Sequence, residues 1–435
     1  MADATRLELT WVGKDNPACP ERRFLLEVPT LSHHADGRTS TSDLLDNRLI
    51  HADNLLALHA LEQEFTNAIK CVYIDPPFNT GQALRHYDDG VEHSRWLSLM
   101  RDRLVLLHRL LRNDGALFVE IDDTESSYLQ VVLDEIFGRS NRVLTVVVRR
   151  SAATGHKAIN RTPVNVSEYI HIYAKNRAAW KYKPTYVRRG DYDWAYSTRL
   201  VNPHDGHEQW RFEPLGELVA KTLGYRSARD ARKALGKKPF DERIVTYALK
   251  HSEEVVRYAQ PKIEAVSKAA RELIGQSERD AGRVFCLRRD AFSDMYFKDG
   301  NRILFLRDKV RNGEEGGLVE PLTNWWDDIP WQGIAREGGV VFPKGKKPEK
   351  LIRRILEMST DPGDWVLDAF AGSGTTGAVS HKMRRQWIMI EAGDHCQTHV
   401  LPRLRRVVAG EDPTGITVAE GWTGGGGFRY FRLAP

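Results

Sequence analysis

Apolar and polar residues follow a rhythm of short buried strands and amphipathic helices in the first part of the chain. Residues 68–74 form an apolar run that ends abruptly at Asp-Pro-Pro, which predicts a buried strand opening into a loop. Apolar residues then recur at helical spacing over 94–111, and the Asn-Asp-Gly of 113–115 predicts the stop. Residues 116–121 and 124–137 continue as strand and helix. This alternation predicts a parallel sheet covered by helices.

The same rhythm returns near the other end of the chain. The pattern predicts helices over 348–358, 375–383 and 394–408 and strands over 365–367 and 387–390. Two separated stretches therefore have the pattern of one α/β domain.

The segment between these stretches has a different character. After two β-rich runs, 143–148 and 169–173, Arg, Lys and aromatic residues become frequent from about Asn176. Helical patches such as 253–274 occur without a repeating order of strand and helix. This predicts an inserted domain.

Length and composition fit that division and narrow the class of protein. A chain of 435 residues is long for a single core, so two domains are expected. There is no apolar run long enough to cross a membrane, and the N-terminus lacks the basic and apolar regions of a signal peptide, so a cytoplasmic location is expected. The 4 cysteines are dispersed, so neither a disulfide framework nor a metal site is indicated, and Cys71 is expected to pack as a small apolar residue. A net charge of +5 fits a nucleic-acid partner without proving one.

The loop after the first predicted strand carries the first candidate site, Asp75-Pro76-Pro77-Phe78. A carboxylate next to a proline carbonyl offers two positioned acceptors, which could hold the two hydrogens of an amine such as the exocyclic amine of a base, whose conjugated lone pair makes it a poor nucleophile. Asp75 can accept one amino hydrogen and the Pro76 carbonyl the other. Pro77 stiffens the loop, and Phe78 offers a face on which a flipped base can stack. The alternative is a simple Pro-Pro turn capped by Asp75.

A glycine-rich turn between a predicted strand and helix carries the second candidate site. Its glycines, Gly372 and Gly374, leave the backbone bare, so a ligand can approach the amides at the helix N-terminus. That geometry suits the methionine carboxylate of S-adenosylmethionine. Glu391 ends the next strand, where a carboxylate can bind ribose hydroxyls. The alternative is a phosphate- or dinucleotide-binding loop, but the chain lacks the full patterns of both.

Together the two sites resemble a known family. The loop Asp75-Pro76-Pro77-Phe78 and its flanks resemble β-class amino-group DNA methyltransferases, especially modification subunits of type III restriction-modification systems. The second turn is similar to their S-adenosylmethionine loop, which implies cofactor-binding roles for Asp368, Phe370, Gly372, Ser373, Gly374 and Thr375. Because the catalytic loop precedes the cofactor loop, the resemblance implies a circularly permuted, Rossmann-like methyltransferase fold. Phe78 stands where Tyr is common in the family.

The resemblance covers roughly residues 48–175 and 321–433 and adds further residues. It implies that Asp53 contacts the cofactor adenine and that Lys347 approaches the methionine carboxylate. For Lys344 and Lys346 we expect a solvated turn. The glycines before Phe428 are expected to bend the chain into a final edge strand.

These features predict four segments. They are an N-terminal extension (1–47), a catalytic half (48–175), a target-recognition insert (176–326) and a cofactor-binding half (327–435). Double-stranded DNA is the expected partner of the insert, while a homodimer and a restriction or defence-system subunit stay open as further partners.

Within the insert, three basic pairs are candidates for phosphate contacts, although solvated surface is the simpler reading for each. Tryptophans near its end could stack on DNA or pack between domains. A segment after the catalytic loop could cover the target base. These candidates are Arg188-Arg189, Lys237-Lys238, Arg288-Arg289, Trp325, Trp326, Trp331 and Gln82–Gly90.

The sequence thus predicts a DNA methyltransferase that acts on N6 of adenine by base flipping and in-line transfer from S-adenosylmethionine. Asp at position 75 favours adenine, with N4 of cytosine as the nearest alternative. A catalytically silent DNA-binding subunit and an RNA-directed enzyme also stay open. If the interpretation is right, Asp75 and Gly372 lie on one rim of the same sheet.

Overall fold

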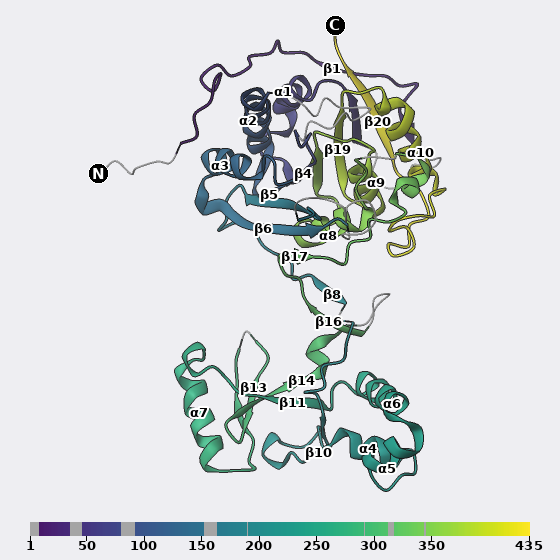
Figure 1. Ribbon diagram of the computed structural model, residues 1–435. Coiled ribbons are helices and arrows are strands. Elements are labelled where there is room, and N and C mark those ends of the chain that lie inside the picture. Colours follow the sequence, from purple (N-terminus) through teal and green to yellow (C-terminus); the bar gives the residue numbers. More distant parts are fainter. Residues whose placement is uncertain are drawn as a thin grey trace, which may run out of the picture. The chain divides into compact units, whose positions relative to one another are not determined.

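The chain divides into two compact units in a computed structural model that describes residues 8–34, 46–79, 92–151, 163–188, 190–290, 292–311, 317–342 and 345–435 (Figure 1). Unit 1 contains residues 1–185 and 323–435, and unit 2 contains residues 186–322. Residues 176–185 and 323–326, which the sequence analysis assigned to the insert, therefore belong to unit 1.

Unit 1 is an α/β domain. Its strands are β1 (Leu25–Glu27), β2 (His33–His34), β3 (Asn47–His51), β4 (Ile69–Ile74), β5 (Leu111–Ile121), β6 (Arg142–Arg149), β7 (Ser167–Ala174), β17 (Trp325–Trp326), β18 (Trp365–Asp368), β19 (Gln386–Glu391) and β20 (Gly427–Leu433). Its helices are α1 (Asn54–Phe65), α2 (His93–Leu110), α3 (Ser126–Phe137), α8 (Glu349–Ser359), α9 (Thr375–Lys382) and α10 (Leu401–Ala409), with a π-helical turn at Cys396–Val400 and short 3₁₀ turns at Arg139–Asn141 and Ile334–Gly339.

These strands form one mixed sheet in the order β1-β20-β3-β19-β18-β4-β5-β7-β6-β17, with β2 also paired to β20. Strands β20, β3, β19, β18, β4 and β5 run parallel, whereas β7 is antiparallel to both β5 and β6. The late strand β18 lies beside the early strand β4, which is the permuted arrangement that the motif order predicted. The fold is therefore Rossmann-like and circularly permuted, as expected.

Two hydrophobic cores lie on opposite faces of this sheet. On β19, Ile388 and Ile390 join the core with α1, α2 and α3, while Trp387 and Met389 join the core with α10. Successive side chains of a strand point to opposite faces, so these alternating residues assign the two helical layers. Figure 1 shows α1 to α3 on one side of the sheet and α9 and α10 on the other. Cys71, fully buried in β4, packs as the small apolar residue expected of it.

The structure corrects three local expectations in unit 1. Strand β5 begins at Leu111, so the Asn-Asp-Gly stop lies inside it, opposite a register shift in β4. There a side chain at Gly115 would come within 2.8 Å of the Ile69 carbonyl oxygen, which explains the glycine. The predicted helix 394–408 starts with the π-helical turn before α10. Finally, β20 is not an edge strand, because β1 and β2 of the N-terminal extension cover its outer side.

Unit 2 contains a separate antiparallel sheet in the order β10-β9-β11-β14-β13-β12 and a small sheet in the order β15-β16-β8. Its strands are β8 (Tyr186–Arg188), β9 (Thr198–Leu200), β10 (Phe212–Pro214), β11 (Val255–Ala259), β12 (Phe285–Leu287), β13 (Met295–Lys298), β14 (Asn301–Phe305), β15 (Val310–Arg311) and β16 (Gly317–Pro321). Its helices are α4 (Leu215–Thr222), α5 (Ala228–Leu235), α6 (Lys237–Lys250) and α7 (Lys268–Arg279). The helical patch predicted at 253–274 is wrong, since β11 occupies its first part and α7 starts only at Lys268.

Unit 2 has hydrophobic cores of its own, one of them between its larger sheet and helices α4 to α6. The chain enters and leaves the unit through neighbouring strands, since Tyr186 of β8 pairs with Pro321 of β16. None of the helices in the described ranges has the length and apolarity needed to cross a membrane.

Candidate active site

The two candidate loops leave the same edge of the sheet. Asp75 follows β4, and the glycine-rich turn follows β18, which pairs with β4 in parallel at Val366–Cys71 and Leu367–Val72. The carboxyl ends of neighbouring parallel strands share one rim, and that rim is where α/β sheets bind ligands. The expectation that Asp75 and Gly372 lie on one rim is confirmed.

Helices α2 and α3 hold the loop that contains Asp75. The indole Nε1 of Trp96, a buried residue of α2, donates a hydrogen bond of 2.8 Å to the Pro77 carbonyl oxygen. Asn79 takes a left-handed conformation (φ 61°) and donates from Nδ2 to Glu125 Oε1 at 2.8 Å. Phe78 is half-buried against the core of this face. The loop is thus fixed at Pro77 and Asn79 by side chains from other parts of the sequence.

The partly buried Asp75 and two buried glutamates of neighbouring strands meet one lysine next to this loop. Lys347 Nζ lies 3.0 Å from Asp75 Oδ1, 3.2 Å from Glu120 Oε1 of β5 and 3.0 Å from Glu168 Oε2 of β7. Arg150 forms a second ion pair with Glu168 at 2.6 Å. The side chains of Glu120 and Glu168 are 0% and 1% exposed, so these charges interact with little screening by water.

Burial and the lysine have opposite effects on the acidity of this cluster. Burial raises the pKa of Asp75 to about 6, although Lys347 opposes it. Burial also raises the pKa of Glu120 well above its ordinary value. For Glu168, burial is outweighed by Lys347, Glu120 and Arg150, which lower the pKa to about 2. Burial of Lys347 is outweighed by the three carboxylates, which raise its pKa.

Glu120 and Glu168 were missed by the sequence analysis. Each is an acidic residue inside an otherwise apolar strand, and that placement was the available signal. Lys347 was identified, and its backbone does reach the cofactor loop, where its carbonyl oxygen accepts a hydrogen bond from Thr375 Oγ1 at 3.2 Å. Its ammonium, however, lies among the carboxylates.

The glycine-rich turn is held by hydrogen bonds to carboxylates at its two ends. Asp368 Oδ1 accepts from the amide of Phe370 at 2.9 Å, and Asp368 Oδ2 accepts from Thr376 Oγ1 at 2.5 Å. Glu391 Oε2 accepts from the amide of Gly372 at 2.8 Å. Burial raises the pKa of Asp368 to about 7.

Gly374 is required where the turn enters α9. It has a φ of 77°, and a side chain there would meet Val400 Cγ1 at 2.8 Å. Ser373 and Thr375 are buried beside it, and Phe370 is partly exposed. The backbone of Gly374, which has no side chain, and the N-terminus of α9 therefore lie next to each other at this rim, where a ligand can approach the amides.

Asp53 lies on the same rim, at the start of α1. Its Oδ1 caps the helix by accepting from the amides of Leu55 and Leu56, and its Oδ2 lies 3.3 Å from Arg103. The next residue, Asn54, donates to the Ala369 carbonyl oxygen of the glycine-rich turn at 2.8 Å. With 51% of its side chain exposed, Asp53 is open to a ligand.

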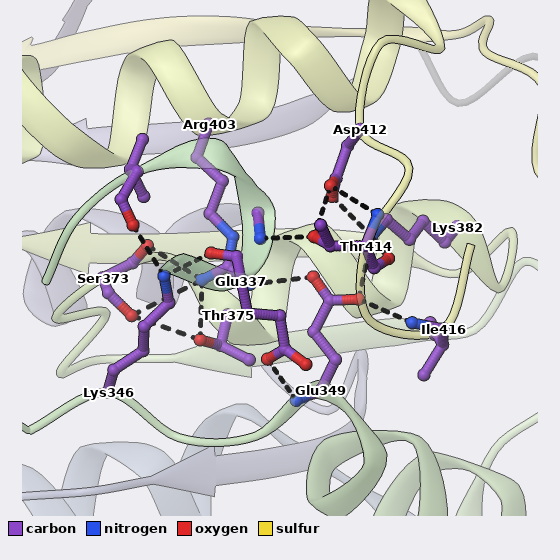
Figure 2. A network of polar contacts seen from close by, with 12 residues as sticks. Glu337, Lys346, Glu349, Ser373, Thr375, Lys382, Arg403, Asp412, Thr414 and Ile416 are labelled. Atoms are coloured by element: carbon purple, nitrogen blue, oxygen red, sulfur yellow. Dashed lines mark hydrogen bonds and ion pairs between the residues drawn. The ribbon is translucent and has the colours of Figure 1, made fainter. Parts of the chain in front are cut away.

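A network of buried charges contacts the turn at Ser373 and Thr375 (Figure 2). Arg403 of α10 donates to the Ser373 carbonyl oxygen at 3.2 Å, to Thr375 Oγ1 at 2.8 Å and to Glu349 Oε1 at 2.8 Å. Lys382 of α9 pairs with Glu349 at 2.8 Å and with Asp412 at 2.6 Å. These four charged side chains are fully buried and balance one another.

Lys346 corrects the expectation of a solvated turn. It is only 4% exposed, and its ammonium donates to the carbonyl oxygens of Ala335, Glu337 and Val340. Burial lowers its pKa to about 8. Charged residues in this segment predicted a solvated turn, whereas the carbonyl groups of the 3₁₀ turn Ile334–Gly339 and of Val340 surround the ammonium of Lys346.

The three candidate tryptophans lie in unit 1. Trp326 is buried in β17 of unit 1, Trp325 is half-exposed beside it, and the ring of Trp331 lies 5.8 Å from Lys347 Nζ. Packing within unit 1 therefore accounts for Trp326. Of the other candidates, Gln82–Gly90, Arg189 and Lys344 lie outside the described residues, whereas Arg188, Lys237, Lys238, Arg288 and Arg289 lie in unit 2.

Comparison with known proteins gives one family and several relatives. The family model described as DNA methylase matches residues 69–400. The chain is 33% identical to the probable type III restriction-modification enzyme HindVI Mod subunit of Haemophilus influenzae, over 94% of this chain and 56% of that protein. It is 26% identical to the type III StyLTI Mod subunit of Salmonella typhimurium (85% and 55%) and 26% identical to the type II methyltransferase M.EcaI of Enterobacter cloacae (88% and 74%). The chain thus spans little more than half the length of the two Mod subunits.

Proposed function

Because the chain belongs to the DNA methylase family, we propose that it transfers a methyl group from S-adenosylmethionine to N6 of adenine in double-stranded DNA. The observation that carries the proposal is the placement of Asp75 and the glycine-rich turn on adjacent strand ends of one rim. Donor and acceptor of a methyl group have to meet in line, and this rim offers a site for each.

The residues of the rim fit the cofactor. Bare amides at the N-terminus of α9 suit the methionine carboxylate, and Gly374 could not carry a side chain without displacing Val400. Glu391 Oε2 holds the turn through the amide of Gly372, while Oε1 accepts from the amide of Gly393 and lies 3.1 Å from His395 Nε2. The carboxylate of Glu391, at the end of β19, is the proposed acceptor for the ribose hydroxyls. Asp53 lies at the adjoining strand end for the adenine. Asp368, Phe370, Ser373 and Thr375 complete the proposed site.

When bound, S-adenosylmethionine supplies an electrophilic methyl group, and the residues of the chain orient the amine. Ionised Asp75 accepts a hydrogen bond from one N–H of the amino group, and the carbonyl oxygen of Pro76 accepts a hydrogen bond from the other. These hydrogen bonds make the nitrogen lone pair available for in-line attack on the methyl group. The Trp96–Pro77 hydrogen bond keeps the loop in place. Phe78 stacks on the base after it has left the duplex. Asp at position 75 favours adenine over N4 of cytosine.

Unit 2 is proposed to recognise the DNA sequence. Lys237 and Lys238 begin α6 and are exposed, and Arg288 and Arg289 follow β12, so both pairs can meet phosphates.

The relatives named as Mod subunits suggest a restriction subunit as a partner, to be sought by copurification. A homodimer is tested by sedimentation.

The proposal is tested by nucleoside analysis of DNA and RNA from cells that express the wild type or Asp75→Ala. N6-methyladenine in DNA that disappears in the variant is the expected result. Methylated cytosine would overturn the choice of base, and modification confined to RNA would overturn the choice of polymer. S-Adenosylmethionine binding that survives in the variant separates loss of catalysis from loss of fold.

A further inference from the structure

The ammonium of Lys347 lies in the catalytic centre, behind Asp75, and away from the cofactor loop that its backbone touches. We propose that Lys347 is a positioning residue that keeps the Asp75 carboxylate ionised and aimed at the target amine. The proposal rests on the proposed function, because it assigns a role in the same reaction.

The contacts of Lys347 support this role. Its Nζ lies 3.0, 3.2 and 3.0 Å from carboxyl oxygens of Asp75, Glu120 and Glu168, and the ring centroid of Phe78 is 4.8 Å away. Only 9% of its side chain is exposed. To reach the methionine carboxylate, the ammonium would give up its ion pairs with Asp75 and Glu168 and its contact with Glu120, and leaving buried charges without partners is strongly unfavourable.

The charges around Asp75 balance when Lys347 is present. Glu120 accepts a hydrogen bond from the Tyr73 hydroxyl and shares another with Glu168, and burial raises its pKa well above the ordinary value, which favours the protonated form. With Glu120 protonated, two cations (Lys347 and Arg150) face two carboxylates (Asp75 and Glu168). The groups that face Asp75 come from every neighbouring element: Tyr73 of β4, Glu120 of β5, Arg150 after β6, Glu168 of β7, Lys347 before α8 and Asp368 of β18.

Loss of the ammonium would leave Asp75 buried beside the negative charge of Glu168. Burial and a like charge both favour the protonated carboxyl. A protonated Asp75 accepts an amino hydrogen less well, so the reaction would require a higher pH. For Glu120, by contrast, burial favours the protonated form, so the proposal does not depend on its charge.

The test compares Lys347→Met with Lys347→Arg and with Lys350→Met, a control on the neighbouring surface of α8. In Lys347→Met, kcat at neutral pH is expected to fall on the order of 100-fold. The acidic limb of the pH–rate profile is expected to move up by about 1–3 pH units. The dissociation constant of S-adenosylmethionine, measured by calorimetry, stays unchanged. Lys347→Arg keeps the charge and returns the limb toward its wild-type position, and Lys350→Met matches the wild type.

Weaker cofactor binding with an unmoved acidic limb would overturn the proposal and assign Lys347 to the methionine carboxylate. If Lys347→Met does not fold, Lys347→Arg and Glu120→Gln decide instead. Glu120→Gln mimics the uncharged acid, so its limb is expected to stay in place, whereas a shift as large as that predicted for Lys347→Met contradicts the charge balance.

A second readout does not depend on methylation of adenine. In Lys347→Met at neutral pH, the infrared band of protonated carboxyl groups is expected to gain intensity, which disappears in Lys347→Met/Asp75→Asn. No gain would contradict the role of Lys347, whatever the substrate. A wild type that forms no N6-methyladenine while this band behaves as expected would instead overturn the proposed function alone.

Discussion

A buried carboxylate accepts an amino hydrogen well only while it is ionised, so the titration of Asp75 sets the lower pH limit of the proposed reaction. Its pKa is raised by burial to about 6, so kcat/KM is expected to fall as the pH drops through about 6. A pH–rate profile of the purified protein, with the dissociation constant of S-adenosylmethionine followed in parallel, checks this. An acidic limb near the ordinary pKa of aspartate would contradict it.

The raised pKa of Asp75 has a different consequence for folding stability, which it favours at low pH rather than at high pH. Because the pKa of Asp75 is higher in the folded than in the unfolded chain, its contribution is fully present below the unfolded pKa and is lost as the pH rises through about 6. The site therefore holds a carboxylate that favours catalysis at neutral pH at some cost in stability.

The sequence alone identified those site residues that belong to a motif of consecutive residues. Asp75 and Gly374 could be identified because turn chemistry and spacing are local properties. Glu120 and Glu168 could not, because their meeting with Lys347 depends on the strand order β4-β5-β7. Lys346 looked like a surface residue because nothing nearby in sequence predicts the turn that covers it.

Among the elements, α2 is expected to control the catalytic loop through a single hydrogen bond. Trp96→Phe removes the donor to Pro77 and keeps most of the apolar contact, so kcat is expected to fall about tenfold and stability by about 1 kcal/mol. Trp387→Phe is the matched control, because this equally buried indole donates to His381 outside the site. A similar loss of stability without loss of kcat is expected there. Equal kcat values for both variants would argue against control by α2.

Helix α10 is expected to support the cofactor loop through Arg403. Arg403→Met leaves Glu349 without one of its buried cations and removes the hydrogen-bond donor to the Ser373 carbonyl oxygen and to Thr375 Oγ1. The unfolding free energy is therefore expected to fall by about 3–5 kcal/mol. S-Adenosylmethionine binding should weaken as well. Urea unfolding and calorimetry measure both effects, with Arg405→Met on the same helix as the control. Unchanged cofactor affinity in a folded Arg403→Met protein would limit the network to stability.

The alternation of strands and helices could be predicted from the local spacing of apolar residues. The ends of individual strands, and which strands lie at the edge of the sheet, could not. Strand β5 runs through a sequence that reads as a turn, since pairing with β4 holds Gly115 extended. The glycine-bent β20 looked like an edge strand, yet β1 and β2 cover it with a segment from the opposite end of the sequence. Long-range pairing decides such cases.

For the whole molecule, unit 2 is expected to be dispensable for folding of unit 1 and for cofactor binding. Tyr186 and Pro321 are paired neighbours, so a short Gly-Ser loop can replace the residues between them. The shortened protein is expected to bind S-adenosylmethionine as the wild type does and to lose site-specific methylation. Full-length Asp75→Ala, which keeps DNA binding, is the control. Methylation at the wild-type sites by the shortened protein would show that unit 2 does not read the sequence.

The claim that the rim of unit 1 is a centre for methyl transfer to adenine is tested most directly with purified protein. Duplex DNA is incubated with S-adenosylmethionine carrying a labelled methyl group and digested to nucleosides, for the wild type and for Asp75→Asn. We expect the label in N6-methyladenine with the wild type, and no label with Asp75→Asn although that variant still binds the cofactor. Label in N4-methylcytosine, or undiminished transfer by Asp75→Asn, would contradict the account.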